Sequence, residues 1–150
     1  MTIIVGGNAR NVGKTTLVCQ LIRASRQREW TAVKISGHPH GAQPPPAPAG
    51  VKPRATAEFL AAGAAHTYLL HENEPDRALL AELARSGRPL IVESNRAAQW
   101  IPFDLYVFIL DEHAPHPKPH ERWLLDRASW VLPPRTDAPA SLLAVTVTQL

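Results

Sequence analysis

The residues with the clearest chemical signature form a segment near the start of the sequence, Gly7-Asn8-Ala9-Arg10-Asn11-Val12-Gly13-Lys14-Thr15-Thr16. Its second half matches the end of a phosphate-binding loop, which is usually a glycine, four residues and then Gly-Lys-Ser/Thr. In such a loop the lysine reaches the β- and γ-phosphates of a nucleotide, and the hydroxyl that follows it binds Mg²⁺. The sequence therefore predicts that residues 7–16 bind the phosphates of GTP or ATP together with Mg²⁺.

This loop departs from the usual pattern at its first glycine. Counting back from Gly13, that position holds Asn8, and Gly7 lies one residue earlier. Asparagine adopts a positive φ more readily than most residues, so we expect the turn to form with such a backbone at Asn8. Arg10, Arg54 and Arg96 are the arginines that could stabilise the charge that develops on a transferred phosphoryl group, and Arg10 is favoured because it lies within the loop.

A carboxylate that completes a Mg²⁺ site is expected at the end of a neighbouring strand. Glu93 has this setting, because it directly follows the apolar run 90–92. Asp111 follows another apolar run, 107–110, and is the alternative acid. We favour Glu93, so Thr15 and Glu93 are the predicted metal-binding residues.

Lys34 is a second candidate cation. It lies near the end of the predicted strand 31–36 and precedes two histidines, His38 and His40. A lysine at that point is expected to face the same crevice as the phosphate loop, where it would neutralise phosphate charge. The predicted catalytic residues are therefore Lys14, Lys34 and Arg10.

Alternating strand and helix patterns are expected to position these residues. Apolar or β-branched runs predict strands at 2–5, 31–36, 66–70, 89–92, 104–110, 130–132 and 144–148. Amphipathic patterns predict helices at 13–28, 55–62, 76–85 and 120–127. This alternation predicts an α/β protein with the single-domain P-loop NTPase fold, a mostly parallel sheet with helices on both faces. Ligands of such sheets bind at the carboxyl ends of the strands, which is where the candidate residues lie.

The composition fits one domain over residues 1–150. A chain of this length with 45% hydrophobic residues can build one core. The net charge of +3 comes from dispersed residues, which argues against nucleic-acid binding. The single cysteine, Cys19, is expected in the core of a helix. The short apolar runs and the lack of a signal-peptide pattern predict a cytoplasmic protein that does not enter a membrane.

A proline-rich segment interrupts the alternation of strands and helices. Six of the 15 prolines lie between residues 39 and 53. Because proline fixes φ and lacks a backbone N–H, we expect residues 38–53 to form a long loop with polyproline II character. Loops of this length are usually functional or disordered.

Four segments together resemble the MobB-like P-loop proteins of molybdopterin-guanine dinucleotide biosynthesis: 7–16, 33–40, 57–64 and 90–95. They are similar to that family's Walker A loop, its Lys/His turn, its helix ending in Ala-Gly-Ala, and its Walker B segment. The resemblance implies GTP binding, a Rossmann-like P-loop fold, frequent homodimers and an accessory role in molybdenum cofactor maturation. This chain has Ser94 in place of the Walker B glycine, and it lacks the Asn-Lys-x-Asp motif that reads guanine.

Two other functions stay open. The spacing of residues 7–15, together with Lys34 and Ser36-Gly37, is also similar to dethiobiotin synthetase, which implies an ATP-dependent ligase or small-molecule kinase. The third function is a noncatalytic module whose proline-rich loop docks a partner protein. Since 150 residues leave little room for a second-substrate domain, we expect a second copy or a partner enzyme to complete an active site.

Overall fold

The computed structural model of the protein describes residues 1–37, 54–115 and 119–148. At its centre is a six-stranded sheet of strand order β3-β2-β4-β1-β5-β6, in which every pairing is parallel. The strands are β1 (Thr2–Gly7), β2 (Thr31–Ser36), β3 (His66–His71), β4 (Leu90–Glu93), β5 (Leu105–Ile109) and β6 (Trp130–Leu132). The α-helices are α1 (Lys14–Ala24), α2 (Arg54–Ala62), α3 (Glu74–Arg85), α4 (Pro119–Asp126) and α5 (Ala140–Thr148).

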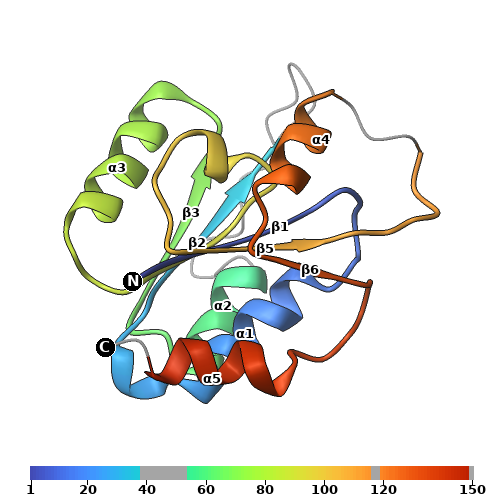
Figure 1. Ribbon diagram of the computed structural model, residues 1–150. Helices are drawn as coiled ribbons and strands as arrows, with labels where there is room; N and C mark the ends of the chain where they lie inside the picture. The colour runs from blue at the N-terminus through green and yellow to red at the C-terminus, as the bar shows by residue number, and fades with distance from the viewer. Residues whose placement is uncertain (38–53, 116–118, 149–150) are drawn as a thin grey trace.

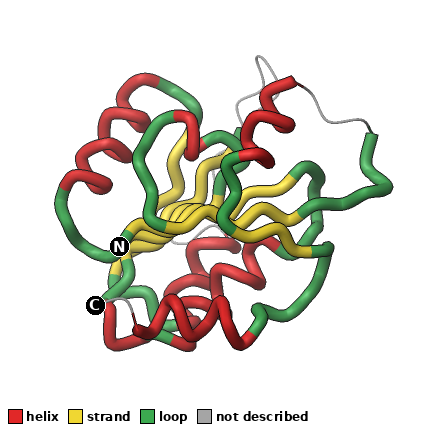
Figure 2. The backbone as a smooth tube through the Cα atoms, in the orientation of Figure 1, coloured by secondary structure: helices red, strands yellow, loops and turns green. Residues whose placement is uncertain are grey.

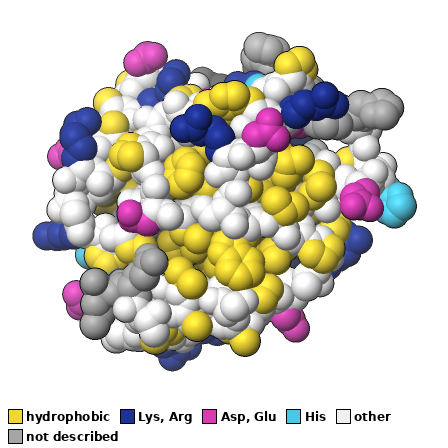
Figure 3. Space-filling model, in the orientation of Figure 1, with side chains coloured by type: hydrophobic (Ala, Val, Ile, Leu, Met, Phe, Trp, Pro, Cys, Tyr) yellow, Lys and Arg dark blue, Asp and Glu magenta, His cyan; other side chains and the backbone are white. Residues whose placement is uncertain are grey.

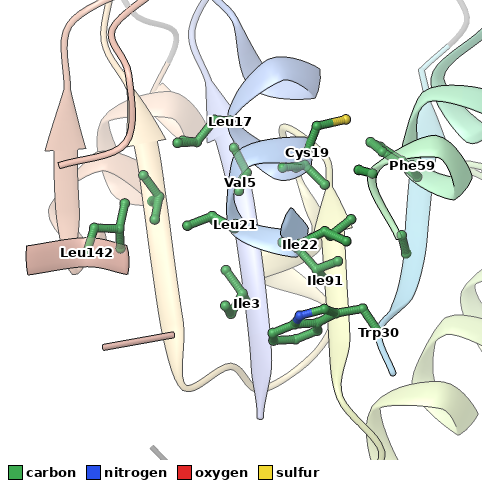
Figure 4. Close-up of a cluster of buried hydrophobic side chains, with 14 of the residues drawn as sticks. Ile3, Val5, Leu17, Cys19, Leu21, Ile22, Trp30, Phe59, Ile91 and Leu142 are labelled. Atoms are coloured by element: carbon green, nitrogen blue, oxygen red, sulfur yellow. The ribbon is translucent and has the colours of Figure 1, made fainter. Parts of the chain in front are cut away.

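Helices cover both faces of this sheet (Figures 1 and 2): α1, α2 and α5 lie on one face, and α3 and α4 lie on the other. Successive side chains of a strand point to opposite faces, so the four central strands, β2, β4, β1 and β5, contribute to two hydrophobic clusters. On one face, Ile3 and Val5 of β1 pack with Leu21 of α1 (Figure 4), whereas Ile4 belongs to the cluster on the α3 face. The predicted α/β fold, with a parallel sheet covered on both faces, is confirmed. Cys19 is buried in the α1 cluster, as expected.

The predicted helix 13–28 is shorter in the structure. The helix α1 ends at Ala24, and a separate 3-10 helix, Arg26–Arg28, follows it. The residue between them, Ser25, is fully buried, and its hydroxyl donates to the carbonyl oxygen of Leu21 and accepts from Trp30 Nε1. These two hydrogen bonds give the buried Ser25 hydroxyl both a donor and an acceptor partner at the point where the chain leaves the helix and turns toward β2.

The predicted strand 144–148 is wrong, because these residues belong to α5. The run Val145-Thr146-Val147-Thr148 is β-branched and favours a strand by propensity. In the structure, however, Leu142 and Thr146 lie one helical turn apart and are both fully buried, and the Thr146 hydroxyl donates to the carbonyl oxygen of Leu143 at 2.7 Å. Packing on the sheet through one helical face therefore overrides the local preference.

The surface exposes few large hydrophobic side chains. Among the described residues these are Trp123, Val131 and Val147. Hydrophobic side chains also gather across the middle of the face shown in Figure 3, with charged side chains around it. The guanidinium of Arg127 lies 4.5 Å from the centre of the Trp123 ring and covers part of it. Within the described ranges, no helix is both long enough and apolar enough to cross a bilayer.

Tyr106 in β5 offers a test of the core. Its side chain is fully buried between Phe103 and Phe108, and burial raises the pKa of its hydroxyl. That hydroxyl has no hydrogen-bond partner within the described part of the chain. Since an unsatisfied buried polar group costs about 1–3 kcal/mol, we expect Tyr106→Phe to increase the free energy of unfolding by about 1 kcal/mol.

Urea unfolding followed by circular dichroism measures this change. The matched control is Tyr68→Phe. Because the Tyr68 side chain is only partly buried, we expect removal of its hydroxyl to change the free energy of unfolding little. A decrease in the free energy of unfolding of Tyr106→Phe would mean that the hydroxyl has a stabilising partner.

Candidate functional site

The carboxyl ends of β1, β2 and β4 bring the predicted residues together. Glu93, the last residue of β4, is in register with Val5 of β1 and with Lys34 of β2. Side chains at the same level of neighbouring parallel strands point to the same face of the sheet. Ile91 and Ala32, two residues earlier in β4 and β2, lie in the hydrophobic cluster on the α1 face. Glu93 and Lys34 therefore also point toward the layer that contains α1.

Glu93 is the centre of the site. Its side chain is only 2% exposed, and both of its carboxylate oxygens have partners. Thr15 Oγ1, at the start of α1, donates to Oε2 at 2.8 Å, and Lys34 Nζ forms an ion pair with Oε1. A carboxylate buried this deeply requires a cation or hydrogen-bond donors beside it, and here Thr15 and Lys34 supply both.

Asp111, the alternative acid, lies outside this network. Its Oδ1 accepts a hydrogen bond from the backbone N–H of His113 at 2.9 Å, and it does not line the cavity that surrounds Glu93. The structure thus places the Thr15 hydroxyl next to Glu93, and the assignment of these two residues to a metal site stays a prediction.

Asn8 has a different role from the one expected of it. Its backbone φ is not positive, and the left-handed residues of the loop are instead Asn11, with a φ of 57°, and Gly13, with a φ of 100°. The Asn8 side chain binds the main chain of Asp111 twice, through Asp111 N–H to Oδ1 at 2.8 Å and Nδ2 to the carbonyl oxygen at 2.9 Å. The expectation of a positive φ at Asn8 is therefore wrong, because this side chain ties the loop to the end of β5.

Gly7 allows the loop to lie close to β5. A Cβ atom at this position would lie only 2.9 Å from the carbonyl oxygen of Ile109. That contact is with backbone, which cannot move aside as a flexible side chain can. The glycine is therefore required by the close approach of β1 and β5 at the point where the loop begins.

The loop leads into the N-terminus of α1, which is open. Gly13 is its N-cap residue, no side chain in the described part of the chain caps it, and its first turn has no acidic residue. In contrast, α3 is capped by Asn73, whose side chain accepts from the Asp76 N–H at 2.9 Å. The first N–H groups of a helix have no partner within the helix, and the helix dipole favours negative charge beside them. This end of α1 is therefore suited to an anion.

Lys14 lies over its own loop, where its Nζ donates to the carbonyl oxygen of Ala9 at 3.0 Å. The pKa of Lys14 is lowered, chiefly by burial and further by the nearby cations Lys34 and Arg10, against the opposing effect of Glu93. An ammonium group that is partly desolvated and close to other cations gains from the arrival of a negative ligand.

These groups surround a cavity of about 830 Å³. Within the described residues, its lining includes five cationic side chains (Arg10, Lys14, Lys34, Arg54 and Arg135) and two carboxylates (Glu58 and Glu93). The cavity is thus a positively charged recess with one buried acid at its base. Such a recess suits a ligand that carries several negative charges and a cation.

The structure sorts the predicted loop residues into two groups. The part that lines the cavity is Arg10, Asn11, Val12, Gly13, Lys14, Thr15 and Thr16. Gly7, Asn8 and Ala9 are not among the lining residues; they pack the loop onto β5 and receive the Lys14 hydrogen bond. The proline-rich loop 38–53, with His38 and His40, lies outside the described residues.

Arg135 is a lining residue that the sequence analysis did not single out. It follows β6, and it binds the loop through its N–H to the carbonyl oxygen of Val12 at 2.8 Å and through Nη1 to that of Asn11 at 3.1 Å. Its backbone has a left-handed φ of 52°. Its position after the predicted strand 130–132 was the available signal, because ligands lie beyond the carboxyl ends of strands.

Comparisons with known proteins identify no relative of this chain. A scan against protein-family models finds no match, and neither a search of curated proteins nor a search of solved structures finds one. The resemblance to MobB-like proteins therefore stays a prediction from the sequence segments that carry it.

Proposed function

We propose that the protein binds a nucleoside triphosphate with Mg²⁺ in this cavity and hydrolyses it slowly. The observation that supports this most is the meeting of an open helix N-terminus, Lys14 and the Thr15–Glu93 pair at one positively charged recess. Each part suits a different part of the same ligand. The helix N–H groups and Lys14 suit phosphate oxygens, and the oxygens of Thr15 and Glu93 suit a divalent cation.

The oxygen donors at the base of the cavity fit Mg²⁺. Thr15 Oγ1 and Glu93 Oε2 are 2.8 Å apart, and a hydroxyl and a carboxylate are hard ligands of the kind that Mg²⁺ prefers. Thr15 and Glu93 would hold the ion together with oxygens of the bound nucleotide and water. When bound, the ion would neutralise charge on the β- and γ-phosphates.

Hydrolysis would begin with attack of a water oxygen on the γ-phosphorus. The bond from that phosphorus to the bridging oxygen would break, and inorganic phosphate and a nucleoside diphosphate would leave. Lys14 and Lys34 would bind the phosphate oxygens, and Arg10, which is exposed at the rim of the cavity, would approach the charge that develops. We expect a slow rate because intrinsic hydrolysis by P-loop proteins without an activating partner is slow.

The proposal includes an accessory role in molybdenum cofactor (guanine dinucleotide) biosynthesis. It is supported by the four segments that resemble MobB-like proteins, since the described part of each contributes to the lining of the cavity, through 10–16, 34–37, Glu58 and 93–95. In this role the nucleotide would be GTP, and a second copy or a partner enzyme would supply the remaining substrate contacts.

Isothermal titration calorimetry with ATP, GTP, CTP and UTP, each with Mg²⁺ and with EDTA, tests the proposal. We expect a purine nucleotide to bind in the micromolar range and to bind more weakly in EDTA. Binding that is equally strong in EDTA would contradict the metal site, and no binding of any nucleotide would contradict the whole proposal. Hydrolysis that one metabolite accelerates sharply would instead indicate a kinase or a ligase.

A further inference from the structure

Lys34 lies where a divalent cation would have to bind. The Glu93 carboxylate has two oxygens, and in this structure Thr15 occupies Oε2 and Lys34 occupies Oε1. A divalent cation on Thr15 and Glu93 would be a second cation beside the Lys34 ammonium, and the two would repel each other at so short a range. The Lys34–Glu93 ion pair therefore opposes the binding of a divalent cation at Thr15 and Glu93.

We propose that Lys34 is a tethered counterion, which neutralises Glu93 in the nucleotide-free protein and moves to the phosphates when a metal–nucleotide complex binds. This inference depends on the function proposed above and goes further, because it gives Lys34 two positions and makes the metal site conditional on the nucleotide.

The burial of the two partners supports this exchange. Glu93 is 2% exposed, so its carboxylate requires a cation beside it to stay charged. Lys34 is 27% exposed, and it lines the same cavity as Lys14, so its flexible side chain has room to swing from Glu93 into the cavity. Lys14 is close enough for Glu93 to affect its pKa, but its ammonium donates to the carbonyl oxygen of Ala9, and the direct ion pair with Glu93 is made by Lys34.

The consequence is an order of binding. While Lys34 is paired with Glu93, a free divalent cation meets a carboxylate that is already neutralised. When the cation binds together with a nucleotide, the phosphate groups can pair with Lys34. Lys34 then leaves Glu93, and the Glu93 carboxylate is free to bind the metal. The protein would therefore bind divalent cations weakly alone and well with a nucleotide.

Titration of the nucleotide-free protein with Mn²⁺, followed by the electron paramagnetic resonance signal of the free ion, tests this inference. We expect Lys34→Met to bind one Mn²⁺ at least about tenfold more tightly than the wild type, because the buried carboxylate is left without its cation. The matched control, Lys34→Arg, keeps a cation beside Glu93 and should bind Mn²⁺ as weakly as the wild type. The double variant Lys34→Met/Glu93→Gln should lose the gain.

Thermal unfolding provides a second readout on the same proteins. A ligand that binds only the folded state raises the unfolding temperature, so Mn²⁺ should stabilise Lys34→Met and leave the wild type unchanged. If Lys34→Met does not fold, Lys34→Gln serves in its place, because it also removes the charge and retains a polar end. Equal Mn²⁺ affinity of the wild type and the folded uncharged variant would overturn the inference.

A parallel titration of the wild type with a Mn²⁺–nucleotide complex separates this inference from the proposed function. Normal binding of that complex, combined with no gain of a Mn²⁺ site in the uncharged variant, would overturn the role of Lys34 alone. No binding of the complex would overturn the proposed function itself.

Discussion

Lys14→Met should weaken nucleoside triphosphate binding by about a hundredfold, which corresponds to roughly 2.7 kcal/mol, within the range for a hydrogen bond to a charged group. Methionine keeps the length of the side chain and removes the ammonium that would bind the phosphates. The fold should persist, because burial lowers the pKa of Lys14, which means that folding desolvates its charge at a cost. Calorimetric titration and circular dichroism measure the two properties on the same sample.

Arg23→Met is the matched control for this loss. Arg23 is an exposed cation on the same helix, α1, and it does not line the cavity. Removal of its charge should therefore leave the affinity unchanged. A similar loss of affinity in both variants would show that the effect comes from the overall charge, and an unchanged affinity of Lys14→Met would contradict the assignment of the loop.

Glu93→Gln should remove most of the dependence of nucleotide binding on Mg²⁺. Glutamine preserves the shape and can still accept the hydrogen bond from Thr15, but it lacks the negative charge that holds a divalent cation. We expect the affinity in Mg²⁺ to fall by about tenfold or more, toward the value measured in EDTA. Titrations over a series of Mg²⁺ concentrations measure this dependence.

Asp111→Asn tests the alternative acid in the same assay. Its carboxylate accepts a hydrogen bond from the His113 N–H, and Asp111 does not line the cavity that contains Glu93, so this variant should keep the Mg²⁺ dependence of the wild type. Loss of the dependence in Asp111→Asn, with its retention in Glu93→Gln, would assign the metal to the other acid.

The local elements of this protein could be predicted from its sequence, because they follow from periodicity. The strand Thr31–Ser36 has the bounds that its sequence predicts, and the segment with Gly13, Lys14 and Thr15 leads from a strand into a helix as its pattern predicts. These features depend on neighbouring residues in the chain. The helix α5 was missed for the opposite reason, since its β-branched residues are held in a helix by contacts with distant parts of the fold.

The sequence alone could not show which acid, Glu93 or Asp111, lies beside Thr15, because both acids follow apolar strands. The answer depends on strand order and on the side-chain direction at the end of each strand. In the sheet, β4 lies between β1 and β2, and its register places Glu93 beside Lys34. Neither the order nor the register of parallel strands is encoded by local periodicity, since the pairing partners are far apart in the chain.

The backbone conformations within the loop also could not be predicted from the sequence. Residue type suggested a positive φ at Asn8, whereas Asn11 and Gly13 are the loop residues that adopt it. The loop also contacts a distant segment, since Arg135, after β6, donates to the carbonyl oxygens of Val12 and Asn11. The structure thus adds a cation to the site that no motif indicated.

A crystal structure with Mg²⁺ and a non-hydrolysable nucleoside triphosphate tests the central claim most directly. We predict that its phosphates lie on the N–H groups at the start of α1, with Lys14 released from Ala9, the metal between Thr15 and Glu93, and Lys34 on the phosphates. An empty cavity in a crystal that contains the nucleotide elsewhere, or a nucleotide bound away from residues 10–16, would contradict the account.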